Sequence, residues 1–511
     1  MAVQPDLVLL VLDTQRADHL SCYGYERQTS PALDALAADA TRFAAAIAPA
    51  QWTVPTHASL FTGLYPSQHT MHQMNSVLPA NLPTLAQRLS QAGYFTAGYS
   101  QNPLIGLVKN ELDRDFAHFE SHHLLSNILL TTRLNRPPTP PSLRKRVERG
   151  VRWFLAEALG YSDETPLQRL APILAPLWQR LLHAQGRSKI AGTRRLLERA
   201  SHLLTEREGV QSGRPIFLFI NLMGAHVPYD PDRRYLQQFL PAERNARRVN
   251  ALLRWANQLQ IDVHNWLNES LPAQERALLE AIYDAEVATQ DAHVGAFLQR
   301  LRAGPRYDNT MIAVVADHGD HLGDKDRVNH GFGVYEPLVH VPLIIRHPDW
   351  RAEAGRVCSR PVSTRRLFHT FLAAADIASS EELALGLDNG GAQDTPDGVV
   401  SEGFPLEWAV GRLRGEKAEY ARKHGHTKTV RAVRNGQYKL IAGEGRRELY
   451  DLQSDASEEH NLQTALPEKV DTLQQQLQAF VDWAAPLAGA QAMDEVDPQV
   501  LQQLRDLGYL E

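Results

Sequence analysis

Four short apolar runs are spread along this 511-residue chain, and each is bounded by polar or turn-forming residues. The runs are Leu7–Leu12, Phe95–Tyr99, Ile216–Leu222 and Met311–Ala316. An uninterrupted apolar run of this length is typical of a strand that is buried on both faces. The pattern therefore predicts a mixed, largely parallel central sheet that is sandwiched by helices.

Helical spacing of apolar residues appears between these runs, at Pro31–Ala46, Leu82–Ala92 and Gln274–Arg302. Strands that alternate with helices indicate an α/β fold. We expect this fold to form one large domain over residues 1–380.

A small α+β domain is expected at 400–511. Two or three strand-like runs with Asn-Gly and Gly-Glu-Gly turns at 427–455 precede a helical segment at 466–484. The Gly- and Asp-rich residues 382–398 predict a loop ahead of this domain.

Residues from about 121 to 205 form a basic helical insertion in this pattern. They contain RPPTPP at 136–141, and fourteen Lys and Arg against five Asp and Glu lie between 131 and 200, in a chain of formal net charge −6. A basic amphipathic helical pair suits peripheral contact with an anionic membrane, or a lid over an anionic lipid or glycan headgroup. A helical cap with a merely solvated basic side explains the same composition, so these alternatives stay open.

The composition is that of an ordinary soluble protein, with 43% apolar and 22% charged residues. The negative net charge gives no reason to expect nucleic-acid binding. Cys22 and Cys358 form neither a disulfide framework nor a CxxC metal pattern. The first apolar run lacks the flanks of a signal peptide, and no run approaches the roughly 20 residues that span a bilayer. We therefore expect a cytoplasmic protein.

Polar side chains follow each predicted strand. Asp13 follows the first strand, Asn102 the second, His226 comes shortly after the third, and Asp317 and His318 follow the fourth. Ligands of open α/β sheets bind beyond the carboxyl ends of the strands. Each residue alone is explained as a turn residue or helix cap, but together they predict a site at one edge of the sheet.

The types of these residues indicate a single divalent metal ion. Asp13, Asp317 and His318 offer two carboxylates and an imidazole, and the Thr53 hydroxyl completes four ligands. Mixed nitrogen and oxygen ligation favours Zn²⁺ or Mn²⁺ over Ca²⁺, which prefers oxygen alone. A metal beside the Thr53 hydroxyl lowers the pKa of that group and makes it a nucleophile near neutral pH.

Thr53 lies in QWTVPTHASLFTG, residues 51–63, where a polar start leads into a helical pattern. We expect the helix to begin after Pro55, with Thr56 as its cap and Thr53 just outside. The free N–H groups and the positive dipole end of such a helix favour a phosphate or sulfate at this place.

Together these segments resemble the sulfatase branch of the alkaline phosphatase superfamily. The matching segments, in order, are LVLLVLDTQRADHLSCYGY (7–25), WTVPTHASLFTGLYPSQH (52–69), GAHVPY (224–229), VVADHGDHLGD (314–324), HGFGVYEPLVHVPLIIR (330–346), and VRAVRNGQYKLI with ELYDL. The resemblance covers most of the chain and implies that residues 1–380 are a metal-dependent catalytic domain.

The signature segment departs from the family pattern Cys-x-Pro-Ser-Arg. Position 53 is Thr, which cannot be converted to formylglycine, the Arg is His57, and the usual second Asp after the first strand is Thr14. These changes imply a site without formylglycine. They are similar to the threonine-nucleophile branches of the superfamily, which include phosphoethanolamine and phosphoglycerol transferases.

We expect further roles for side chains around Thr53, and a purely structural role is the alternative for each of them. His57 is expected to donate to a nonbridging oxygen or to act as a base, and His226 to bind such an oxygen or to protonate the leaving group. His330 is expected to have similar uses. The expected substrate-binding residues are Asn102, His321 and Lys325, whereas Arg16 and Asp18 are expected to form a structural ion pair.

Three functions agree with these residues. The first is a metal-dependent hydrolase of a small anionic phosphate ester, above all a diester, through a phospho-threonine at Thr53. An acceptor alcohol in place of water would make the same enzyme a phospho-headgroup transferase. The second is a sulfate-ester hydrolase without formylglycine. The third is a binding protein on an inactive sulfatase fold, which the joint presence of Asp13, Asp317, His318 and His226 argues against.

Overall fold

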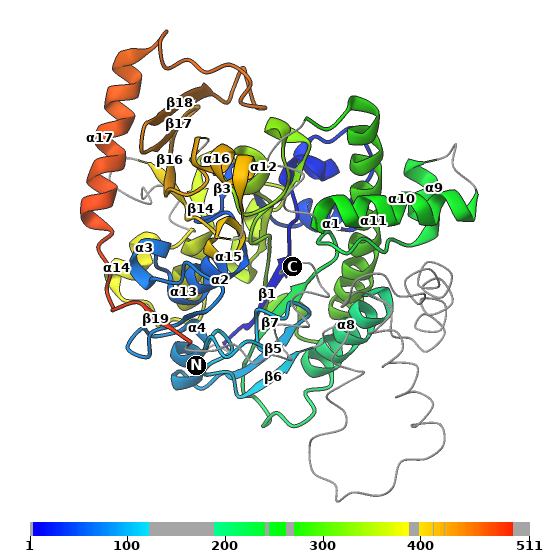
Figure 1. Cartoon of the computed structure of the whole chain (residues 1–511). Coiled ribbons are helices and arrows are strands. Elements are labelled where there is room, and N and C mark those ends of the chain that lie inside the picture. Colours follow the sequence, from blue (N-terminus) through cyan, green and yellow to red (C-terminus); the bar gives the residue numbers. More distant parts are fainter. Residues whose placement is uncertain are drawn as a thin grey trace, which may run out of the picture.

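The computed structural model describes residues 4–121, 189–240, 245–261, 270–387, 398–411, 413–423 and 425–493. Its centre is an eight-stranded sheet in the order β13-β2-β12-β8-β1-β7-β5-β6 (Figure 1). The strands are β1 (Asp6–Leu12), β2 (Thr41–Phe43), β5 (Phe95–Ser100), β6 (His118–Ser121), β7 (Ile216–Leu222), β8 (Thr310–Val315), β12 (Leu343–Arg346) and β13 (Val357–Cys358).

The middle of this sheet is parallel. β1 pairs in parallel with β7 on one side and β8 on the other, and β5 and β6 continue the parallel run beyond β7. β12 alone is antiparallel to its neighbours β8 and β2. Every residue of β1, β7 and β8 is buried, as their uninterrupted apolar runs predicted. The predicted fold class is confirmed.

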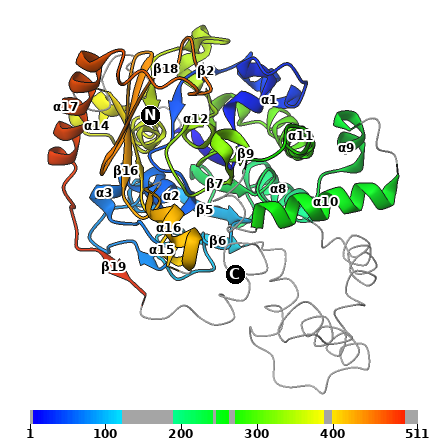
Figure 2. The same ribbon diagram turned by 45° about the horizontal axis from the view of Figure 1, so that its top comes forward.

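Helices cover both faces of the sheet (Figures 1 and 2). One group packs around the long helix α11, and the other around α13. The first group is α1 (Pro31–Ala37), α8 (Lys189–Thr205), α9 (Arg233–Phe239), α10 (Ala246–Ile261) and α11 (Ala273–Arg302). The second is α2 (Thr53–Thr62), α4 (Leu85–Gln91), α13 (Leu367–Ala374) and α14 (Ser380–Leu385).

Two sequence expectations were wrong. The helix predicted at Pro31–Ala46 ends at Ala37, because the following residues form β2 and β3 (Ala46–Ile47) and pair with strands about 300 residues away. The loop predicted at 382–398 begins as helix α14, whose capping box joins Ser379 and Glu382. Residues 388–397 lie outside the described residues.

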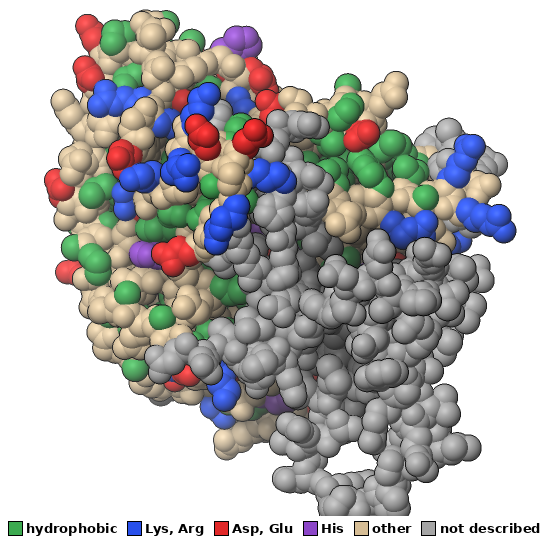
Figure 3. All heavy atoms as spheres, viewed as in Figure 1, with side chains coloured by type: hydrophobic (Ala, Val, Ile, Leu, Met, Phe, Trp, Pro, Cys, Tyr) green, Lys and Arg blue, Asp and Glu red, His purple; other side chains and the backbone are tan. Residues whose placement is uncertain are grey.

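Most of the predicted basic insertion, from 122 to 188, lies outside the described residues, and its end forms α8. On the face shown in Figure 3, Lys and Arg side chains alternate with Asp and Glu over the described left-hand part. Within the described ranges, no helix is both long enough and apolar enough to cross a bilayer.

The C-terminal part is an antiparallel sheet with one long helix against it (Figure 1). The strands are β15 (Val399–Gly403), β16 (Val430–Asn435), β17 (Tyr438–Gly443) and β18 (Arg446–Asp451), and the helix is α17 (Pro467–Trp483). The strand-like runs and the helix predicted at 427–484 are confirmed, whereas β15 was not foreseen. The division between residues 380 and 400 stays a prediction, and residues beyond 493 lie outside the described part.

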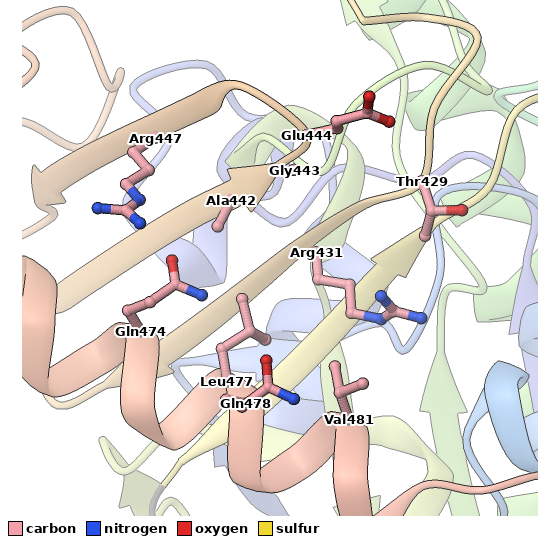
Figure 4. Close-up of a pocket in the computed structure, with 10 residues that line it drawn as sticks. All are labelled: Thr429, Arg431, Ala442, Gly443, Glu444, Arg447, Gln474, Leu477, Gln478 and Val481. Atoms are coloured by element: carbon pink, nitrogen blue, oxygen red, sulfur yellow. The ribbon is translucent and has the colours of Figure 1, made fainter.

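An open hollow of about 310 Å³ lies between this sheet and α17. Figure 4 shows Arg431 and Arg447 from the strands opposite Gln474 and Gln478 from the helix. The Arg431 guanidinium is held by the Glu402 carboxylate at 2.8 Å. This hollow contains none of the predicted site residues.

A buried charge cluster joins the C-terminal sheet to the larger part of the molecule. The Lys439 ammonium on β17 lies 2.8 Å from carboxylate oxygens of both Glu336 and Glu458. Glu336 opens the short helix α12 (Glu336–Val339) and also accepts a hydrogen bond from Arg434 at 3.0 Å. Because Lys439 is only 1% exposed, its charge depends on these partners.

We predict that Lys439→Met lowers the free energy of unfolding by about 3–5 kcal/mol, because it leaves the buried Glu458 carboxylate without its cation and removes one of the two cations beside Glu336. Lys428→Met is the matched control. Its ammonium lies 2.8 Å from Glu444, but the two side chains are 51% and 72% exposed. Such a surface pair contributes less than about 1 kcal/mol. Urea unfolding of the two variants measures the difference, and equal midpoints would contradict the prediction.

Candidate metal centre and active site

The carboxyl ends of the parallel strands bring the predicted residues together. Asp13 directly follows β1, Asn102 comes two residues after β5, and Asp317 comes two residues after β8. His226 lies in the loop after β7. The convergence that the sequence predicted at one edge of the sheet is therefore present in the structure.

Asp13, Asp317 and His318 form a tight, fully buried cluster. One side-chain ligand atom from each lies within 4.8 Å of the others. His318 Nε2 is 3.4 Å from Asp317 Oδ2 and 3.8 Å from Asp13 Oδ1. His318 Nδ1 donates to the Gly319 carbonyl at 2.9 Å, so that the Nε2 lone pair faces the two carboxylates.

The unused oxygen atoms of this cluster fit a divalent cation. Asp13 Oδ2 accepts a hydrogen bond from Asn102 at 2.6 Å, and Asp317 Oδ1 accepts from the backbone N–H of His318 at 2.9 Å. Among the described residues, neither Asp13 Oδ1 nor Asp317 Oδ2 accepts a hydrogen bond, although both are buried. A buried carboxylate oxygen without a partner is costly unless it coordinates a metal. The cluster therefore has the ligand types and the unpaired oxygens that a divalent metal would need.

The electrostatics of the two carboxylates lead to the same conclusion. Burial raises the pKa of Asp317 well above its usual value, and the charge of Asp13 raises it further. Burial also raises the pKa of Asp13, but the charges of His226 and His318 and the Asn102 hydrogen bond leave it below its usual value. Two such close carboxylates are both ionised when a divalent cation lies between them.

The Thr53 hydroxyl belongs to this cluster. Thr53 is fully buried, and its Oγ1 lies 3.3 Å from His318 Nε2 and 3.5 Å from Asn102 Nδ2. Helix α2 begins at Thr53 itself. The hydroxyl thus lies at the N-terminus of a ten-residue helix and beside His318, one of the predicted metal ligands.

The expectation that the helix begins after Pro55 was wrong. Proline is tolerated in the first helical turn, because the N–H that it lacks has no intrahelical partner there. Pro55 therefore lies inside the helix, whose N-cap is Trp52. Thr56 is not the cap either, since its hydroxyl donates to the Ala50 carbonyl at 3.4 Å.

His57 lies one turn behind Thr53 and supports it. Its Nδ1 donates to the Thr53 carbonyl at 3.0 Å, and its Nε2 accepts from the Asn221 amide at 3.4 Å. Burial lowers the pKa of His57 to about 4, although the Asp13 charge opposes this effect. The ring is therefore neutral at pH 7, and both of its nitrogens bind protein groups.

His226 and His330 lie next to each other on one side of the cluster. Their ring centroids are 5.1 Å apart, and the His330 ring is 4.5 Å from that of His318. Burial lowers the pKa of His226 to about 4 and that of His330 well below its usual value. His226 Nδ1 donates to the Val227 carbonyl, so that the neutral ring carries its proton on Nδ1 and its lone pair on Nε2.

Of the three predicted substrate-binding residues, the structure brings one into the cluster. Asn102 is there, but its amide holds the Asp13 carboxylate. His321 is buried in β9 (His321–Leu322), with its ring 6.3 Å from that of Tyr335. The Lys325 ammonium donates to the Glu458 carbonyl and lies 5.2 Å from the Tyr450 ring centroid, so it is directed to the C-terminal sheet.

The ion pair expected between Arg16 and Asp18 is present. Arg16 Nη2 lies 2.7 Å from Asp18 Oδ2, and Arg16 Nη1 lies 2.7 Å from Asp324 Oδ2. Arg16 also donates to the Asp320 carbonyl at 3.1 Å. This guanidinium therefore connects the segment after β1 to the segment after β8.

The sequence analysis missed residues that touch the predicted site. Asp320, two residues after His318, is buried with its Oδ1 3.4 Å from His330 Nδ1, and the repeated acids of DHGDHLGD were a signal for it. Asn221, within an apolar run, holds His57. The buried Lys189–Glu286 pair has no local sequence signal, because its members lie 97 positions apart.

Comparisons with known proteins agree with this geometry. The family model described as Sulfatase matches residues 5–377. The uncharacterized sulfatase YidJ of Escherichia coli (strain K12) is 23% identical over 476 residues, covering 90% of this chain and 83% of that protein. An arylsulfatase of Clostridium perfringens (strain 13 / Type A) is 24% identical over 391 residues, covering 74% of this chain and 76% of that protein.

A solved structure extends the comparison to the fold. The phosphonate monoester hydrolase of Agrobacterium radiobacter superimposes with a TM-score of 0.64 at 20% identity. The match covers 96% of this chain and 100% of that chain. The fold of the two proteins is therefore shared over almost their whole length.

Proposed function

The chain belongs to the sulfatase family of metal-dependent ester hydrolases, and from this we propose that it cleaves phosphate esters, above all diesters, with Thr53 as the nucleophile. The main support is the Thr53 hydroxyl, which lies 3.3 Å from His318 Nε2 in a fully buried cluster. Threonine cannot become formylglycine, so the aldehyde chemistry of sulfatases is closed to this site. Direct attack by the hydroxyl on phosphorus is open to it.

Asp13, Asp317 and His318 are the residues that would hold the metal. Two carboxylates and an imidazole suit Zn²⁺ or Mn²⁺ better than Ca²⁺. When bound, the cation supplies charge that lowers the pKa of the Thr53 hydroxyl. Asn102 orients Asp13, and His57 holds the first turn of α2 through the Thr53 carbonyl, so the nucleophile is oriented before the substrate arrives.

In the proposed reaction, the Thr53 hydroxyl loses its proton to solvent, and Oγ1 attacks phosphorus in line with the leaving oxygen. The bond from phosphorus to that oxygen breaks as a proton passes to it from His226. The His226 ring is neutral in the free protein, so its Nε2 has to take up a proton from solvent first, and the negative charge of the bound ester favours this uptake. Water then attacks phospho-Thr53 and gives one proton to the now neutral His226, and the Thr53 oxygen takes up a proton from solvent as it departs, which releases the phosphate product and returns the hydroxyl. An acceptor alcohol in place of water would transfer the phosphoryl group instead.

Two features would hold the nonbridging oxygens. Helix α2 begins at Thr53, and the first N–H groups of a helix have no intrahelical acceptor. They point toward the ligand together with the positive end of the helix dipole. His330, which lies between His226 and His318, is the second donor that we propose for these oxygens.

A panel of aryl esters tests this proposal. We predict that kcat/KM of the purified protein with Mn²⁺ or Zn²⁺ is at least about tenfold higher for bis(para-nitrophenyl) phosphate than for para-nitrophenyl sulfate. This ratio corresponds to about 1.4 kcal/mol of transition-state free energy. The phosphate monoester para-nitrophenyl phosphate is assayed beside them.

Sulfate esters are the second candidate substrates, because the two relatives above are both named as sulfatases. Faster turnover of the aryl sulfate than of the phosphate diester would establish sulfate esters as the substrates. It would contradict our proposal that phosphate diesters are the preferred substrates. A protein that cleaves none of the three esters and binds no metal would instead be a binding protein.

A further inference from the structure

A buried ion pair lies directly behind the His226 loop. Lys189 begins helix α8, Glu286 lies in the middle of α11, and the two side chains are 5% and 2% exposed. The Lys189 ammonium lies 3.1 Å from Glu286 Oε1. In the sequence analysis, Lys189 was one of the basic residues of the predicted insertion. In the structure, its side chain is buried beside the site.

All three N–H groups of this ammonium have an acceptor. Lys189 Nζ donates to the His226 carbonyl at 2.8 Å, to the Pro228 carbonyl at 3.1 Å and to Glu286. Glu286 Oε1 in turn accepts the backbone N–H of Asp230. One ion pair therefore binds three backbone groups within residues 226–230.

Burial makes such a pair expensive, and apolar side chains of similar volume would often be at least as stable. Stability alone therefore gives little reason for an ion pair here. The pair does supply something that apolar side chains cannot, which is a set of fixed hydrogen bonds to the backbone that carries His226. Fixing a catalytic side chain to within a fraction of an ångström requires this kind of support.

We infer that Lys189 and Glu286 are positioning residues for His226, and that they fix its Nε2 where the leaving oxygen of the ester departs. This inference rests on the proposed function, in which His226 protonates that oxygen. It also means that the segment leading out of the insertion supplies part of the active site. Loss of the pair should therefore slow the step that needs the proton more than it slows substrate binding.

The leaving group of the substrate separates this role from a merely structural one. A para-nitrophenolate leaves without a proton, whereas an alkoxide needs one. For Lys189→Met we expect kcat on a dialkyl phosphodiester, whose leaving group is an alkoxide, to fall on the order of a hundredfold. On bis(para-nitrophenyl) phosphate we expect a fall of about threefold and an unchanged KM. His226→Gln should show the same selectivity more strongly.

Two further variants keep the test independent of folding. The double variant Lys189→Met/Glu286→Gln removes both charges, so that no unpaired charge stays buried. It should show the same preferential fall of kcat on the ester with the alkoxide leaving group as Lys189→Met alone. Lys439→Met is the matched control, because it removes another buried lysine that is paired with carboxylates in the C-terminal sheet. It should reduce stability without changing the ratio of the two rates.

Three results would overturn parts of this account, and they differ from one another. The positioning role is wrong if His226→Gln slows one ester more than the other, but both Lys189 variants slow the two esters by the same factor, as we expect for Lys439→Met. If His226→Gln is not selective, the role of His226 is wrong and the positioning role fails with it. If the wild-type protein hydrolyses neither ester, the proposed function itself fails.

Discussion

Thr53→Ala is expected to lower kcat/KM on a phosphodiester at least about a thousandfold, or about 4 kcal/mol of transition-state stabilisation. The substitution removes the hydroxyl that lies 3.3 Å from His318 Nε2 and no other polar group. Water would have to attack phosphorus from a site that is built for a side chain. The effect should fall on kcat, because the helix N-terminus and His330, the groups that we propose to bind the ester, remain.

Thr56→Ala is the matched control for this prediction. Thr56 is on the same helix and equally buried, but its hydroxyl donates to the Ala50 carbonyl instead of facing the cluster. Its variant should keep activity within about threefold of the wild type. Full phosphodiesterase activity in Thr53→Ala would show that another group is the nucleophile.

Mass spectrometry examines the same residue directly. Peptides from protein that is quenched during turnover should carry a phosphoryl group on Thr53, and peptides from resting protein should carry unmodified threonine. The phosphoryl group should be absent from Thr53→Ala. A phosphorylated histidine in its place would assign the nucleophile to that histidine.

Asp317→Ala is expected to remove the bound metal and, with it, at least about a thousandfold of the activity. Asp317 supplies one of the two carboxylates and has an oxygen that accepts no hydrogen bond among the described residues. Metal analysis of the purified proteins should find about one divalent ion per wild-type chain and almost none in the variant. Asp13→Ala should behave in the same way.

The metal should also stabilise the wild-type fold. An ion that binds only the folded protein adds about 2.7 kcal/mol to the free energy of unfolding when its concentration is a hundredfold above its Kd. Adding Zn²⁺ or Mn²⁺ to chelator-treated protein should therefore raise the Tm of the wild type but not that of Asp317→Ala. We expect Ca²⁺ to raise it less, because one of the ligands is an imidazole nitrogen.

Asp18→Asn is the control for the loss of a carboxylate near the same strand end. Asp18 is 56% exposed on its side chain and pairs with Arg16 instead of facing the cluster. Its variant should keep both the metal and the activity. Stoichiometric metal in both Asp13→Ala and Asp317→Ala would show that the ion is held elsewhere.

Much of the fold could be predicted from sequence because a strand that is buried on both faces appears as a run of consecutive apolar residues. β1, β7 and β8 are buried on both faces, so every position in them has to be apolar, and the pattern stands out along the chain. The local sequence does not indicate which strands pair with each other. The residues of β2 continue a helical pattern, and only their pairing with β12 and β13 makes them a strand.

The sequence by itself determined which residues could supply the chemistry. Polar residues that follow buried parallel strands must meet at one edge of the sheet, and this rule predicted the meeting of Asp13, Asn102, Asp317 and His318. Threonine at position 53 also needs no structure to exclude formylglycine. These conclusions depend on covalent identity and on the short-range order of the chain.

The tertiary structure alone decided what each side chain does. It starts α2 at Thr53, holds both nitrogens of His57, directs Lys325 toward the C-terminal sheet and places Lys189 behind His226. Apart from the start of α2, each of these roles depends on a partner that is distant in sequence, such as Asn221 for His57 or Glu286 for Lys189. Hydrogen bonds and ion pairs act only over a few ångströms, so their partners become known only when the chain has folded.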